Sequence, residues 1–191
     1  MSRSNKDRTE ATRTALLDAA RRLFVEKGYA QTATPDIVAA AGVTRGALYH
    51  HFEDKKALFL AVAEREAAAV AAEIETTATP STDARMALLS GARGYFDAMA
   101  ANGRTRLLLL EAPAVLGANA AAAIDRDNAE RSLHAGLSAL LRQHGGRDAL
   151  DRELTALLSA AFDRAAMEIA AGADRKAYEA ALAELIDGLA R

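Results

Sequence analysis

The chain has 191 residues, of which 51% are hydrophobic and 26% charged, and it contains no cysteine. A chain of this length can bury a substantial hydrophobic core without covalent cross-links. The lack of cysteine excludes disulfides, thiolate catalysis and cysteine-based zinc sites. The sequence has no apolar run long enough for a membrane span and no apolar N-terminal stretch typical of a signal peptide. We therefore expect a soluble, cytoplasmic protein with no membrane contact.

The net charge of -2 is unevenly distributed. Residues 1–60 carry ten Lys or Arg and seven Asp or Glu, whereas the remaining residues carry fourteen and nineteen. A basic N-terminal part on an acidic remainder is typical of a protein whose N-terminal part contacts a polyanion, but an excess of three charges also arises by chance.

Composition favours an all-α fold, because strong helix formers dominate and the chain has only 3 Pro and 12 Gly. Apolar residues at helical spacing predict about nine helices and no strand. In chain order, helices are expected over 9–27, 35–41, 45–51 and 54–76, from 81 or 83 to 102, as a turn or two over 104–110, over 118–144, from 148 or 151, and from 174. Pro80 and Gly145-Gly146 are expected to mark breaks.

The first three predicted helices carry clear boundary signals. Gly28 follows the first helix as a stop, and Thr34 with Pro35 predicts the N-cap and first position of the second. Gly42 ends that helix and Thr44 is expected to cap the third. Two short helices joined by the turn Gly42-Val43-Thr44 form a helix-turn-helix pattern.

The string AGVTRGALYHHFEDKKAL, residues 41–58, closely resembles the DNA-binding head of the tetracycline-repressor (TetR/AcrR) family of bacterial transcription regulators. The resemblance covers about residues 9–60; beyond it, only the number and order of helices are similar. It implies a DNA-binding domain over 1–54 and a ligand-binding and dimerisation domain over 55–191. It further implies a homodimer that binds a palindromic operator in double-stranded DNA and is released by a small, largely apolar effector, without a cofactor.

A helix that enters the major groove needs an outer face of small or hydrogen-bonding residues. By resemblance, DNA contacts are expected at Thr32, Thr34, Thr44, Arg45, Gly46, Ala47, Tyr49, His50 and Lys55, with Lys55 near a helix N-terminus as the phosphate anchor. Family members often have Ser or Thr where this chain has Ala33, so which threonine meets a phosphate stays open. Alternatively, Arg45 is only solvated and Tyr49 packs against the first helix. Arg3, Lys6 and Arg8 form either an arm that reaches DNA or a solvated tail.

The remainder of the chain offers candidates for an effector pocket and a dimer interface. Pocket residues are expected among Arg93, Phe96, Met99, Leu107, Leu110, Glu111, Leu116, His134, Leu137 and Asp163. The last two helices have wide apolar stripes, which predict a four-helix dimer interface with Leu154, Leu158, Phe162, Leu182 and Ile186. The alternative is that these stripes face only the chain's own core.

The sequence contains no Gly-x-Ser-x-Gly, no phosphate-binding glycine loop and no His-Glu-x-x-His, so we expect neither catalysis nor a metal site. Two other functions stay open. One is a regulator that activates transcription or needs no ligand. The other is a helical protein-interaction scaffold whose head no longer binds DNA.

Overall fold

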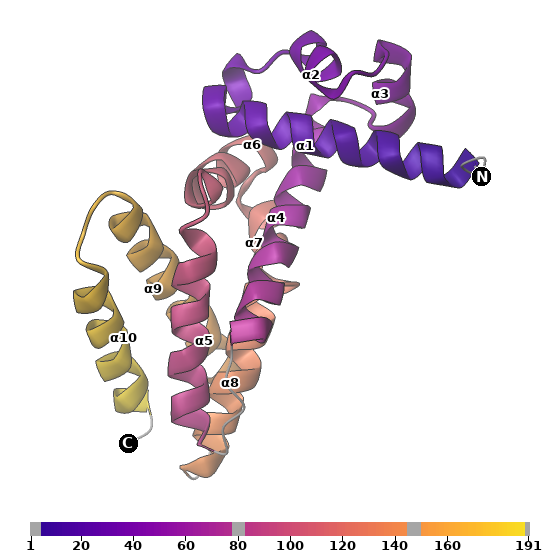
Figure 1. The fold of residues 1–191 in the computed structure, drawn as a ribbon. Helices are drawn as coiled ribbons and strands as arrows, with labels where there is room; N and C mark the ends of the chain where they lie inside the picture. Colours follow the sequence, from indigo (N-terminus) through magenta and orange to yellow (C-terminus); the bar gives the residue numbers. More distant parts are fainter. Residues whose placement is uncertain (1–4, 78–82, 145–149, 190–191) are drawn as a thin grey trace.

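The computed structural model describes residues 5–77, 83–144 and 150–189, so the breaks expected at Pro80 and at Gly145-Gly146 lie outside the described residues, as do Arg3 and Asp148. Over the described ranges the chain forms ten α-helices and one π-helical segment and no strand, which confirms the all-α prediction. Figure 1 shows a small head, with helix α1 lying across one end of a longer helical body. None of the described helices is long and apolar enough to cross a membrane.

The head consists of α1 (Asn5–Gln31), α2 (Thr34–Ala41) and α3 (Arg45–His51). The predicted stop at Gly28 is an interruption of α1, where this glycine has φ 80° and ψ 163°. Gly42 ends α2 in the left-handed conformation, and the Thr44 hydroxyl caps α3 by accepting from the Ala47 amide at 3.2 Å, as expected.

The predicted cap of α2 is wrong by one residue. Thr34 is the first helical residue, and the N-cap position belongs to Ala33, which makes no side-chain cap bond. Pro35 therefore occupies the second helical position, where its missing N–H still costs nothing because the first-turn amides have no partner within the helix.

Helix α4 (Lys55–Thr77) joins the two parts of the molecule and is capped by Asp54, whose carboxylate accepts from the Ala57 amide at 2.6 Å. Its first half contributes Leu58, Phe59, Val62 and Ala63 to the head core, and its second half contributes Val70 and Ile74 to the body core. The two cores thus meet inside α4, and a domain boundary after Asp54 stays a prediction.

The body packs α4 against α5 (Ala84–Met99) and α8 (Ala129–Gln143). Helix α9 (Asp151–Ala170) lies on α8, and α10 (Arg175–Leu189) covers α5 and α9 (Figure 1). Asp151 is the first helical residue of α9 rather than its cap, which is Leu150. Asp174 does cap α10, where its carboxylate accepts from the Lys176 amide at 3.0 Å.

The single helix predicted over 118–144 is wrong, because the chain forms α7 (Ala118–Arg126) and α8 with a break between them. At the break, Asn128 has φ -127° and ψ -103°, and its side-chain amide donates to the Ile124 carbonyl at 2.7 Å. A side chain that hydrogen-bonds the preceding turn gives the backbone an alternative to a continuous helix.

A π-helical segment, η1 (Arg106–Glu111), runs directly into α6 (Ala112–Leu116) and connects the end of α5 to α7. The turn before it depends on Gly103, which has φ 73°. A Cβ atom at Gly103 would lie 2.4 Å from a Val25 methyl carbon, so this glycine allows the body to approach α1 closely.

We expect Gly103→Ala to destabilise the protein by roughly 2–4 kcal/mol, from left-handed backbone strain and the collision with Val25 together. Gly172→Ala is the matched control, because Gly172 also has positive φ but has no atom near a new Cβ. The control should lose only about 1–2 kcal/mol. Urea denaturation of both variants at one protein concentration measures the difference; equal losses would contradict the packing role of Gly103.

Candidate DNA-binding face and effector cavity

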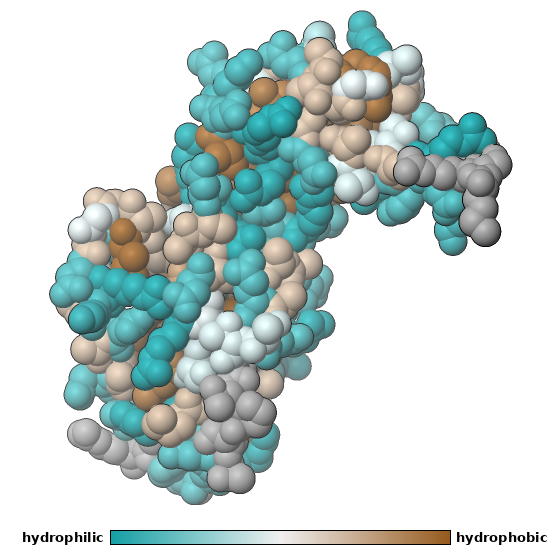
Figure 2. Space-filling view, in the orientation of Figure 1, coloured by the Kyte–Doolittle hydropathy of each residue, from teal (hydrophilic) through white to brown (hydrophobic). Residues whose placement is uncertain are grey.

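The outward face of α3 presents the side chains that a recognition helix needs. Arg45, Gly46 and His50 are exposed and Tyr49 is 44% exposed, whereas Leu48 points inward and is fully buried. The Arg45 guanidinium lies 5.5 Å from the centre of the Tyr49 ring, so the two side chains lie together. In Figure 2, the surface over α3 shows hydrophobic residues among hydrophilic ones. Thr44 and Ala47 lie at the start of the helix, where Thr44 is exposed and Ala47 partly so.

Two of the expected DNA contacts make structural hydrogen bonds within the chain, and their contact with DNA stays a prediction. Thr32 is 1% exposed and its hydroxyl donates to the Gly28 and Leu23 carbonyls at 2.7 and 3.2 Å, so it cannot present that hydroxyl to a phosphate as it stands. The Lys55 ammonium donates to the Tyr29 and Thr32 carbonyls at 2.9 and 3.0 Å and lies over the Tyr29 ring. Both residues fix the loop between α1 and α2. Thr34 is partly exposed at the start of α2.

A buried ion-pair network fastens the head to the body. Glu66 of α4 is 5% exposed and accepts from Arg21 of α1 at 2.8 and 3.0 Å and from Arg104 at 3.1 Å. Arg104 also donates to Glu73 and to the Ala98 carbonyl. Burial by itself raises the pKa of a carboxyl, but the two guanidinium groups outweigh it and lower the pKa of Glu66.

The segment η1 and α6 makes a second connection, at the C-terminal end of α1. Arg106 donates to the Phe24 and Val25 carbonyls at 2.7 and 2.9 Å, and Glu111 accepts from the Tyr29 amide at 3.2 Å. Leu107 of this segment is buried in the head core. The segment η1 is therefore in direct contact with α1 through hydrogen bonds and core packing.

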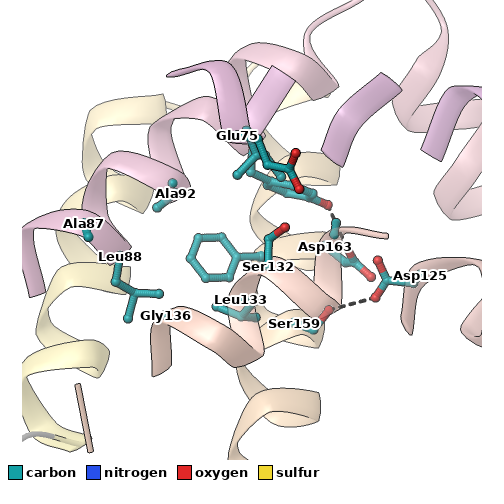
Figure 3. Close-up of a pocket in the computed structure, with 15 residues that line it drawn as sticks. Glu75, Ala87, Leu88, Ala92, Asp125, Ser132, Leu133, Gly136, Ser159 and Asp163 are labelled. Carbon is teal, nitrogen blue, oxygen red and sulfur yellow. Dashed lines mark hydrogen bonds between the residues drawn. The ribbon is translucent and has the colours of Figure 1, made fainter. Parts of the chain in front are cut away.

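Two of the cavities in the described part of the body are adjacent. The smaller, of about 220 Å³, lies between α4, α5, α8 and α9 (Figure 3), and the larger, of about 480 Å³, extends from α5 and α9 to η1, α6 and α7. Most of their lining is aliphatic or aromatic. Their shared wall consists of Tyr95, Asp125, Ala129, Ser159 and Asp163.

The shared wall carries two carboxylates in a largely apolar setting. The Tyr95 hydroxyl donates to Asp163 at 2.7 Å, and the Ser159 hydroxyl donates to Asp125 at 2.9 Å. Burial raises the pKa of Asp163 to about 6, against the hydrogen bond from Tyr95 and with help from the negative charges of Asp125 and Glu130. Burial also raises the pKa of Asp125. Among the described residues, no group of three or more His, Cys, Asp or Glu is placed to hold a metal ion.

Two of the ten residues expected at an effector pocket, Met99 and Asp163, line these cavities. Leu107 and Leu116 pack in the head core, Phe96 and Leu137 in the body core, and Glu111 binds the Tyr29 amide. Leu110 is 54% exposed, Arg93 is exposed, and His134 contacts Thr155 beside a shallow hollow. The sequence analysis does not single out Asp125, Tyr95 or Ser159 for the pocket. The available signal is the polar pair Ser159 and Asp163, which lie one turn apart beside the apolar residues Leu158 and Phe162.

The residues expected at the dimer interface lie inside the chain instead. Leu158, Phe162, Leu182 and Ile186 are at most 5% exposed and belong to the body core, and Leu154 packs against it. The packing of the single chain favours the alternative interpretation, in which these stripes face the chain's own core. Helices α5 and α8 cover α9, while α5 and α9 cover α10.

The fold and the exposed face of α3 define a helix-turn-helix protein with a separate, cavity-containing helical body. The family model for bacterial regulatory proteins of the tetR family matches residues 16–62, and the model for the tetracyclin repressor-like C-terminal domain matches residues 85–191. The chain belongs to the tetR family of bacterial regulatory proteins, and it is a DNA-binding regulator rather than an enzyme.

Individual relatives agree with this assignment. The TetC protein of transposon Tn10 from Escherichia coli is 33% identical over 135 residues, which is 71% of this chain and 68% of that protein. The transcriptional regulator AcrR of Shigella flexneri is 49% identical over 59 residues, which is 31% of this chain and only 27% of that regulator. A crystal structure of a TetR-family regulator from Pectobacterium atrosepticum is 32% identical, with a TM-score of 0.71, covering 98% of this chain and 95% of that one.

We expect Glu66→Gln to cost roughly 2–3 kcal/mol at neutral pH, because it leaves the buried Arg104 and its neighbour Arg21 without their shared charge partner. A folded-state pKa below the unfolded value stabilises the protein above the unfolded pKa and ceases to do so as pH falls through the folded pKa. The difference between wild type and variant should therefore shrink below about pH 4.

Denaturant titrations at several pH values measure this difference. The control is Asp18→Asn, which breaks the exposed pair of Asp18 with Arg65, and it should cost less than about 1 kcal/mol. A loss in Glu66→Gln no larger than in the control would refute the role of Glu66.

Proposed function

We propose that the chain acts as a homodimeric repressor that binds a palindromic operator through α3 and leaves it when a small, largely apolar effector fills the cavities. One observation carries the proposal. The segment η1 and α6 lines the larger cavity with Leu108, Leu109 and Pro113, and it also reaches the head core through Leu107. An effector in that cavity therefore touches the same short segment that holds α1.

Direct contact with base edges is assigned to the exposed face of α3. Arg45 and Tyr49 supply hydrogen-bonding and stacking groups, and Gly46 leaves room for close approach, since a Cβ atom there would meet only the Thr44 hydroxyl at 3.9 Å. His50 lies beside Gly46 one turn further on. In a two-fold dimer, two such helices enter successive major grooves about 34–36 Å apart.

The dimer interface is assigned to the outer faces of α9 and α10, since their inner faces are used within the chain. Leu157 is 70% exposed and Leu185 is 53% exposed. On α10, Leu185 is accompanied by the exposed alanines Ala177 and Ala181, which lie on the same face at four-residue spacing. Small residues beside an exposed leucine allow helices of two copies to pack closely.

We attribute release from DNA to the two connections between head and body, one through α4 and one through η1. Helix α4 lines the larger cavity with Ala67 and Val70, and the same helix carries Glu66 and the head residues Leu58 and Phe59. An effector that fits best when α4 and η1 are displaced favours a different placement of the head. By linkage, DNA and effector then weaken each other's binding, typically by about 1–3 kcal/mol.

Selection from a random duplex library at near-physiological salt tests the DNA-binding function, and we expect a palindromic motif. On the selected sequence, Arg45→Ala and Tyr49→Ala should each weaken binding by about 1–3 kcal/mol. Arg142→Ala is the control, because Arg142 is exposed at the end of α8, on the body. If the folded protein enriches no DNA sequence, or if the alanine variants bind DNA like wild type, the result would favour the hypothesis of a protein-interaction scaffold.

Sedimentation analysis tests the dimer. Leu157→Glu and Leu185→Glu place a charge in the assigned interface and should shift the protein from dimer to monomer. Leu110→Glu is the matched control, because Leu110 is 54% exposed on η1, outside α9 and α10. A wild-type monomer, or a dimer that survives both substitutions, would contradict the assigned interface.

A further inference from the structure

The smaller cavity is chemically polarised along its length. Figure 3 shows Ala87, Leu88 and Gly136 at one end and Asp125, Ser159 and Asp163 at the other. The carboxylate end belongs to the wall shared with the larger cavity, so Asp125 and Asp163 line both cavities. A ligand that fills this space meets apolar surface over most of its length and negative charge at one place.

The charges around the shared wall are unbalanced. Helix α4 contributes Glu75, α7 contributes Asp125 and Arg126, α8 contributes Glu130, and α9 contributes Asp163. Arg126 is thus the single basic residue against four acidic ones on the lining of the two cavities. Within the described ranges, no Lys, Arg or His side chain forms an ion pair with Asp125 or Asp163.

A buried carboxylate elsewhere in the chain, that of Glu66, has a different environment. Glu66 receives two arginine side chains at 2.8 to 3.1 Å, which lower its pKa. Asp125 and Asp163 receive only hydroxyl donors, and burial raises the pKa of both. The charge of Arg126 acts on Asp125, but within the described residues neither carboxylate has an ion-pair partner. Two neighbouring carboxyl groups of this kind in a largely apolar space favour the binding of a cation.

We propose that the effector is an amphipathic organic cation, with its apolar body in the two cavities and its positive centre between Asp125 and Asp163. The proposal rests on the proposed function and specifies the ligand of the same site. Apolar burial supplies affinity, and the two carboxylates select a positive charge over a neutral or negative one.

Charge selectivity is tested with tetraphenylphosphonium and tetraphenylborate, ions of nearly equal shape and opposite charge. Calorimetric titration of the full-length protein without DNA should show the phosphonium binding at least about tenfold more tightly at about pH 7.5. Its affinity should fall toward about pH 5, because Asp163 then becomes protonated and neutral. Equal affinity for both ions, tighter binding of the borate, or no phosphonium binding would overturn the proposal.

Substitutions test whether the positive centre of the ligand lies between Asp125 and Asp163. Asp163→Asn and Asp125→Asn keep an oxygen that accepts from Tyr95 or Ser159, so both should fold, as circular dichroism checks. Each should weaken phosphonium binding about fivefold or more, and together they should abolish the preference and its pH dependence. Glu64→Gln removes one charge from an exposed position outside both cavities and should bind like wild type. A preference that survives the double variant would overturn the assigned position.

The outcome is separable from that of the DNA experiment. An operator-binding protein that ignores the phosphonium refutes the cationic effector and leaves the regulator intact. A protein that binds the phosphonium through Asp125 and Asp163 but enriches no DNA supports the ligand class and refutes the operator function.

Discussion

Glu66 is the point on which the arrangement of the two parts depends. Its carboxylate is buried where α1, α4 and the turn after α5 meet, and it is tolerated there because Arg21 and Arg104 approach from two sides. A buried carboxylate without such partners would be costly, so the three segments are held in one relative placement. That placement fixes α1 relative to the body, and it also brings η1 against α1, where Arg106 and Glu111 bind the C-terminal part of α1.

The head was predictable because its signals are local. Gly42 and Thr44 define the turn and the cap by their own conformational preferences, and the structure uses both as expected. The body was less predictable because its decisive contacts are either subtle or distant. The break between α7 and α8 depends on one Asn128 side chain, and the direction of the α9 and α10 stripes depends on which helices cover them.

Residue type alone does not reveal what an individual side chain contacts within the chain. Thr32 and Lys55 are predicted to contact phosphates because of their types and positions, and the structure adds that both hydrogen-bond backbone carbonyls at the end of α1 and in the loop that follows. In the body, Asp163 was foreseen as a polar group of the pocket, but its neighbour Asp125 comes from a helix 38 residues earlier in the sequence. Only the folded chain brings the two acids to one wall.

The π-helical geometry of η1 explains how one short segment packs against both the head core and the body core. Residues five apart in an α-helix are separated by about 1.4 turns and point in different directions. In η1 the wider turn brings Leu107 and Ala112 to the same side, into the head core, while Leu109 packs against the body core and Leu108 packs against both. Removing one residue from this segment would rotate every later side chain up to Gly117 by about 100° around the helix axis. Side chains that now pack in the head core would then no longer point toward it.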